Sequence, residues 1–168
     1  MDYKIHFKLA DDLIHHLDSV AGGLTDPFIA SRYVGFVAVV GTTVYELAIK
    51  EIFIEFSWKK HRVLGNFVSR YFDRLNGRIK ADQLRNEYLP RFGDSYVKKY
   101  KKLESEAENF SLQNHKVSLL SSYNNLIEWR HQFSHGGQIP TTPSYKEVTS
   151  AYELGKEIIH CLAKALGS

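Results

Sequence analysis

The chain has 168 residues, of which 43% are hydrophobic and 24% are charged, values that exclude a disordered segment and suit a single folded domain. The net charge is only +3, so the composition permits an RNA or nucleotide partner without requiring one. The single cysteine, Cys161, excludes an intrachain disulfide, and no apolar run has the length of a signal peptide or a bilayer span. We therefore expect a cytoplasmic protein.

Apolar residues recur at helical spacing along most of the chain, which predicts an all-α fold. The first helix should span residues 4–21 and end at a glycine pair. Asp26 and Pro27 then have the residue types of an N-cap and a first helical position. These two residues should begin the second helix.

The second helix should run from residue 28 to about residue 57 and is apolar on most sides. The Val and Thr content of residues 37–44 would also suit a strand, and Gly35 and Gly41 are local points of doubt. The helical pattern that continues through Glu51 favours a helix. Such a helix is typical of the centre of a bundle or of a subunit interface.

Shorter helices are predicted over residues 63–75 and 81–92. The segment 94–108 combines lysines with glutamates at one-turn spacing, so we expect an exposed or mobile helix there. Ser144 should cap the last helix, which carries an apolar stripe as far as Ala165.

Three arginines recur every four residues along the third predicted helix, at Arg70, Arg74 and Arg78. This spacing predicts that they share one helix face. Two interpretations stay open: a solvated face that pairs with Asp73, or a track for RNA phosphates that leads toward an active centre.

The most informative stretch is LIEWRHQFSHGG, residues 126–137. An apolar helical run precedes it, and its glycine pair suits the left-handed conformation that ends many helices. Within six residues it holds a permanent cation, Arg130, two imidazoles, His131 and His135, and the hydroxyl of Ser134.

Arg130 and His135 suit phosphodiester chemistry. A guanidinium binds phosphate oxygens bidentately and stays charged, whereas an imidazole takes or gives a proton near neutral pH. Five positions on an α-helix correspond to a rotation of about 140°. The two side chains therefore converge only if the last turn unwinds, or if another helix or another subunit supplies the other half of the site.

The same pair has a simpler interpretation. Basic side chains in the last turn of a helix interact favourably with the helix dipole, and chance gives on the order of one such pair in a chain of this composition. The placement at the end of an amphipathic helix, directly before glycine, favours a functional site instead.

The stretch from Arg130 to His135 resembles the Arg-x4–6-His motif of the HEPN superfamily, whose members are all-helical and often dimeric. The arginine, the polar residue after it and the His-Gly pair match, although the family most often has Asn where this chain has His131. The run NFVSRYFDRLNGRI, residues 66–79, also resembles a bacterial HEPN subfamily found near defence genes. The resemblance implies one HEPN-like domain over residues 1–168, a bundle of four to five main helices.

The resemblance also implies a function, that of a metal-independent endoribonuclease acting as a toxin or phage-defence effector. Two copies of the chain would form a homodimer, with two Arg130–His135 pairs in one cleft, and the RNA 2′-hydroxyl would attack without a metal or cofactor. His135 would move the proton, Arg130 would stabilise charge on the phosphoryl oxygens, and His131 would orient Arg130 or bind phosphate. Ser134 and the three arginines are substrate-binding candidates. The implied partners are RNA and an antitoxin or another defence-system protein.

Two other functions stay open. The domain could bind a nucleotide or a partner protein through Arg130 and His135 without cleaving anything, or it could be a plain helical scaffold. The sequence holds no glycine-rich phosphate loop, nucleophile elbow or metal-binding His/Cys spacing. A P-loop enzyme, a nucleotidyltransferase or a zinc enzyme is therefore not expected.

Overall fold

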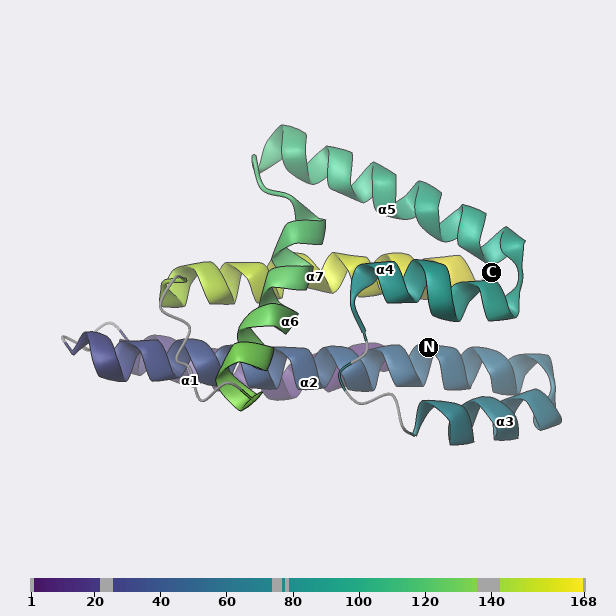
Figure 1. Ribbon diagram of the computed structural model, residues 1–168, viewed down its shortest axis with the longest axis horizontal. Helices are drawn as coiled ribbons and strands as arrows, with labels where there is room; N and C mark the ends of the chain where they lie inside the picture. The colour runs from purple at the N-terminus through teal and green to yellow at the C-terminus, as the bar shows by residue number, and fades with distance from the viewer. Residues whose placement is uncertain (1, 22–25, 74–76, 78, 136–142, 168) are drawn as a thin grey trace.

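The structure, a computed structural model, describes residues 2–21, 26–73, 77, 79–135 and 143–167, without the side chains of residues 21, 27, 28, 30 and 135. Every regular element within these residues is helical (Figure 1). The predicted all-α fold is therefore confirmed.

The helices follow one another with short connections. A 3₁₀ turn, Tyr3–His6, precedes the first helix, and α4 continues directly into a π-helical turn, Leu84–Tyr88, and a 3₁₀ turn, Leu89–Phe92. In chain order the helices are α1 (Phe7–Ala21), α2 (Pro27–Lys60), α3 (Arg62–Phe72), α4 (Ala81–Gln83), α5 (Asp94–Asn114), α6 (Leu119–His135) and α7 (Tyr145–Leu166).

Helix α2 is the central element of the bundle. It packs against α1, α3, α6 and α7, and Figure 1 shows α6 crossing it while α7 runs along it. The helix is unbroken over residues 37–44, which excludes the strand. Its many buried positions explain why the sequence is apolar on most sides.

Gly35 and Gly41 do not interrupt α2 but mark where other helices approach it closely. The ring of Phe133 in α6 occupies the space that a side chain at Gly35 would need. A Cβ atom at Gly41 would lie 2.9 Å from Tyr152 Cδ2 in α7 and 3.1 Å from Leu126 Cδ2 in α6. The glycines therefore allow contact distances that alanine would not.

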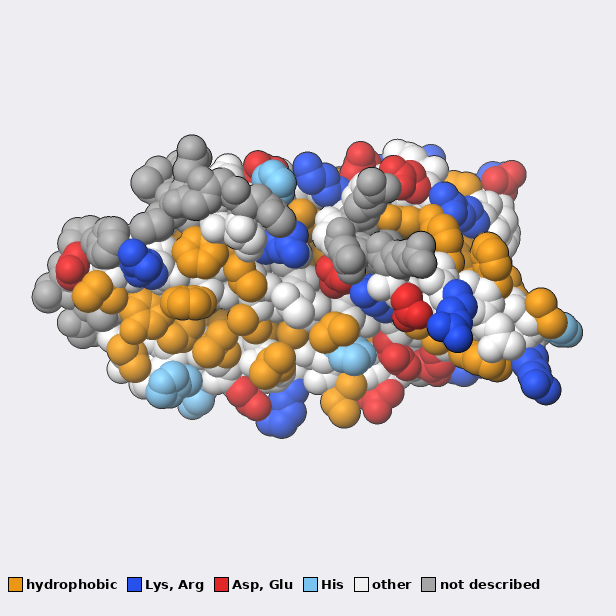
Figure 2. All heavy atoms as spheres, turned by 60° about the horizontal axis from the view of Figure 1, so that its bottom comes forward, with side chains coloured by type: hydrophobic (Ala, Val, Ile, Leu, Met, Phe, Trp, Pro, Cys, Tyr) orange, Lys and Arg blue, Asp and Glu red, His pale blue; other side chains and the backbone are white. Residues whose placement is uncertain are grey.

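Part of the apolar surface of α1 and α2 remains uncovered within the described residues. Val20 of α1 and Ile29 and Phe36 of α2 are exposed, and Figure 2 shows hydrophobic side chains gathered over the end of the molecule that these parts of the two helices form. We call this surface, defined by Val20, Ile29 and Phe36, the α1–α2 face.

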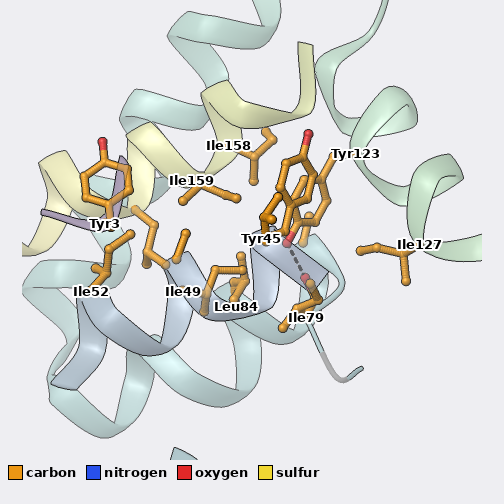
Figure 3. Packing of buried hydrophobic residues seen from close by; sticks show 14 of the residues in the cluster. Tyr3, Tyr45, Ile49, Ile52, Ile79, Leu84, Tyr123, Ile127, Ile158 and Ile159 are labelled. Atoms are coloured by element: carbon orange, nitrogen blue, oxygen red, sulfur yellow. Dashed lines mark hydrogen bonds between the residues drawn. The ribbon is translucent and has the colours of Figure 1, made fainter. Parts of the chain in front are cut away.

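Buried tyrosines join α2, α6 and α7 in the core (Figure 3). The Tyr45 ring stacks on Tyr123 with a centroid distance of 5.4 Å and on Tyr152 at 5.6 Å. The Tyr123 hydroxyl donates a hydrogen bond to the Ile79 carbonyl oxygen at 2.5 Å, and the Tyr45 hydroxyl donates to the Tyr152 carbonyl oxygen. These bonds satisfy the buried hydroxyls and hold α6, which carries residues 126–135, against the core.

Helix α5 corrects one expectation. Instead of standing exposed, it packs against α7, and Tyr100, Glu104 and Ser111 are buried. The burial of α5 was not evident from the sequence, because its apolar stripe is narrow and lies between lysines and glutamates. The stripe consists of Tyr100, Leu103 and Ala107. The stripe is enough to bury one face, while the charges cover the other.

Two local predictions hold. Helix α2 begins at Pro27, as its residue type indicated. Ser144 caps α7 in a capping box, in which its Oγ accepts from the Glu147 N–H at 3.2 Å and Glu147 Oε2 accepts from the Ser144 N–H at 2.7 Å. Within the described residues, the helices fall short of the combined length and apolarity that a bilayer crossing would require.

Candidate functional site

Arg130 lies near the C-terminal end of α6, and its side chain is half-buried. Its guanidinium faces Gly77, where a Cβ atom would lie 3.1 Å from Nη1. Gly77 has a φ of +73°, a left-handed conformation that glycine adopts at little cost. In the turn before α4, backbone atoms of Gly77 therefore lie next to the Arg130 guanidinium with no side chain between them.

Glu46 of α2 holds this turn in place. The Gly77 N–H donates to Glu46 Oε2 at 3.0 Å, and Lys50 Nζ lies 3.1 Å from Glu46 Oε1. Both carboxylate oxygens thus have partners of their own. Among the described residues, Arg130 has no hydrogen bond or ion pair, so its donors stay available for an anion.

Helix α6 stays regular through His135. Positions 130 and 135 are therefore about 140° apart around the helix axis, and the alternative in which the last turn unwinds is excluded. Positions 131 and 135 share one face, as do positions 130 and 134. The side chain of His135 lies outside the described part of the structure.

Phe133 anchors the last turn of α6. Its ring packs over Gly35 and lies 6.0 Å from the ring of Phe36, measured between centroids. Trp129, one turn earlier, is partly buried against the core. The end of α6 is thereby fixed beside the α1–α2 face.

The remaining predicted site residues are spread over two elements. His131 and Ser134 of α6 and Arg70 of α3 are exposed. Arg74 and Arg78 lie outside the described residues. Of the three arginines predicted to share one helix face, Arg70 lies on α3, which ends at Phe72, and the common face stays a prediction.

Two contributors to the site escaped the sequence analysis. The Asn-Gly pair signals a turn at Gly77, but nothing local shows that this turn would meet Arg130. Glu46 is one of several charged residues in α2, and no local pattern sets it apart from the others. In the described part of the chain, no group of three or more His, Cys, Asp or Glu side chains is arranged to hold a metal ion.

An all-helical bundle in which a late helix carries Arg-x4-His at its C-terminal end has the features of an HEPN domain. A comparison with protein-family models matches residues 6–168 to the family described as RiboL-PSP-HEPN. The chain belongs to this family, and so to the HEPN superfamily. Comparisons with curated proteins and with solved structures returned no match.

Proposed function

We propose that this HEPN domain is a metal-independent endoribonuclease, a toxin or phage-defence effector, whose active site is completed by two copies of the chain. The observation that carries the proposal is the half-buried Arg130, which faces bare backbone at Gly77 and has no anionic partner among the described residues. Such a guanidinium is placed to receive a phosphate.

The chemistry requires one base, one acid and a group that stabilises negative charge. A histidine removes the proton of the RNA 2′-hydroxyl, whose oxygen bonds to phosphorus while the bond from phosphorus to the 5′-oxygen breaks. A second histidine protonates the leaving 5′-oxygen, and the product is a 2′,3′-cyclic phosphate. Arg130 stabilises the charge on the phosphoryl oxygens.

A dimer provides the two histidines. Because positions 130 and 135 lie on different faces of a regular helix, one chain alone does not aim both groups at one phosphate. In the proposed dimer, His135 and the partner's His135 act as base and acid, while His131 orients Arg130 or binds phosphate. Ser134 and Arg70, both exposed, then bind the strand, together with Arg74 and Arg78.

The α1–α2 face supports this assembly. Exposed apolar side chains that cluster on one surface indicate a contact site, and Phe36 of this face is 52% exposed. The ring of Phe36 touches Phe133 in the last turn of α6. A twofold axis through this face therefore brings the ends of two α6 helices together.

Substitution of His135 tests the catalytic proposal. Purified protein is incubated with mixed RNA in EDTA, and cleavage is followed by electrophoresis. His135→Ala should lower the rate by roughly 10²- to 10⁴-fold, the usual contribution of a general acid or base, while circular dichroism and molecular mass stay unchanged. Cleavage by this variant at the wild-type rate would contradict the proposal.

The same assay separates the two other functions. RNA that is retained by the wild-type protein without being cleaved favours a non-catalytic nucleotide- or protein-binding module. An absence of both retention and cleavage favours a helical scaffold, in which Arg130 only complements the helix dipole.

A further inference from the structure

Helix α3 has an outward face that is apolar and partly aromatic. Its inward residues Val68 and Phe72 are buried, whereas Val63 and Phe67 are 68% and 66% exposed and Tyr71 is also exposed. A spacing of four residues places Val63, Phe67 and Tyr71 in one stripe along the helix. Large apolar side chains exposed in a row indicate a contact surface.

The two rings of this stripe lie almost parallel. The centroids of Phe67 and Tyr71 are 6.3 Å apart with an angle of 14° between the planes. The guanidinium of Arg91 lies 4.7 Å from the Tyr71 centroid, and its Nε donates to the Glu87 carbonyl oxygen at 2.9 Å. The stripe thus presents flat π-faces, one of them supported by a cation.

The charged side chains of α3 itself are all positive. Helix α3 contains Arg62 and Arg70, both exposed, and no Asp or Glu, and the next acidic residue is Asp73 at its C-terminal cap. Figure 2 shows Lys and Arg side chains, with Asp and Glu side chains among them, interspersed with hydrophobic ones over the end of the molecule where α3 lies. A second copy of this chain would bring the same cations to the contact, which opposes self-association here.

The stripe lies close along the chain to Gly77, the residue that faces Arg130. Gly77, which faces the Arg130 guanidinium, follows Tyr71 by six residues, so the two Cα atoms are at most about 20 Å apart. One strand of nucleic acid can therefore reach from the stripe toward the arginine.

We propose that the outward stripe of α3, with Phe67 and Tyr71 stacking on bases and Arg62, Arg70 and Arg91 contacting phosphates, binds single-stranded RNA. Stacking on aromatic rings beside a cationic groove is the usual way in which proteins bind single strands without reading their sequence. The inference rests on the RNA substrate proposed above and adds a binding surface outside the Arg130 site.

An RNA that cannot be cleaved tests the stripe by itself. A fluorescent 2′-O-methyl oligonucleotide of about 12 nucleotides, within the range of single-strand site sizes, lacks the 2′-hydroxyl nucleophile. Its affinity is measured by anisotropy. Phe67→Ala should weaken binding roughly five- to a hundred-fold, the range expected when one stacked base is lost.

Matched variants separate stacking from general apolar contact. Phe67→Trp keeps a π-face and should retain binding, whereas Phe67→Leu keeps the apolar surface and should weaken binding as alanine does. Phe110, 63% exposed on α5, is the control, and Phe110→Ala should leave the affinity unchanged. Arg70→Gln should reduce the dependence of log affinity on log salt by about one.

Three outcomes would overturn the inference: no binding of the oligonucleotide by the wild-type protein, unchanged affinity in Phe67→Ala, or a change in oligomeric mass in Phe67→Ala without a change in affinity. The last outcome would identify α3 as a protein interface. Because the oligonucleotide is not cleaved, a failure of the His135→Ala test leaves this binding result intact. The nuclease proposal and the stripe can therefore fail separately.

Discussion

Gly35 and Gly77 shape the candidate site through the side chains that they lack. At Gly35 the absent side chain makes room for the Phe133 ring, which holds the last turn of α6. At Gly77 the absent side chain permits both a left-handed backbone and the approach of the Arg130 guanidinium. Two residues without a functional side chain thus help to position the motif.

Gly35→Ala is expected to destabilise the protein although alanine is the better helix former. The added methyl group overlaps the Phe133 ring, and overpacking of this kind costs about 1–3 kcal/mol. Urea unfolding should show a lower midpoint with an unchanged slope, together with weaker RNA cleavage.

A double variant controls for this cause. Gly35→Ala in a Phe133→Ala background should cost less than it does alone, because the overlapping ring is gone. Equal costs in the two backgrounds would show that the contact with Phe133 is not responsible.

At the scale of the elements, the packing of α5 has an electrostatic cost because it buries the carboxyl group of Glu104. Glu104 is buried, and its Oε2 accepts a hydrogen bond from Arg85 Nη1 at 3.1 Å. The other carboxylate oxygen, Oε1, and the Tyr100 hydroxyl are buried without a hydrogen-bond partner in the described structure. Burial raises the pKa of Glu104 above its ordinary value of 4.5, and the nearby Arg85 opposes part of this shift. The charged form is therefore less favourable in the folded state than in the unfolded chain.

Glu104→Gln should increase the free energy of unfolding at pH 7. Because the folded pKa of Glu104 lies above 4.5, the folded state binds more protons than the unfolded state in the window between those two values. The contribution of Glu104 to stability therefore falls as the pH rises through that window and stays low above it. Glutamine does not titrate, so the variant should lack this decline in urea midpoints measured from pH 4 to about pH 7.

Arg85→Gln is the opposing control. It removes the cation beside Glu104 and should deepen the decline with pH. A Glu104→Gln variant less stable than the wild type at pH 7 would instead show that the Glu104–Arg85 pair is net stabilising.

For the whole molecule, the α1–α2 face and the end of α6 form one continuous surface through the Phe36–Phe133 contact. Dimerisation and catalysis should therefore depend on the same residues. An HEPN domain whose site needs two chains loses activity when it becomes a monomer, even if each chain remains folded.

Phe36→Glu is expected to produce a folded, inactive monomer. A charge at the centre of an apolar contact must be desolvated without a partner, which costs several kcal/mol. Light scattering should show the monomer mass, circular dichroism should show unchanged helicity, and RNA cleavage should be lost.

Phe110→Glu places the same charge at another exposed phenylalanine, on α5, and should leave both mass and cleavage unchanged. A Phe36→Glu variant that remains dimeric, or that cleaves RNA as a monomer, would contradict the proposed assembly.

Local patterns were sufficient for the helical class, the cap at Ser144 and the start of α2 at Pro27, because spacing, capping and residue type act within one or two helical turns. They also pointed to Arg130 and His135, whose role in a site stays a prediction. The burial of α5, the end of α3 at Phe72 and the meeting of Gly77 with Arg130 depended on the folded chain. Each of these features arises from contacts between residues far apart in the sequence, and no pattern within one helix contains that information.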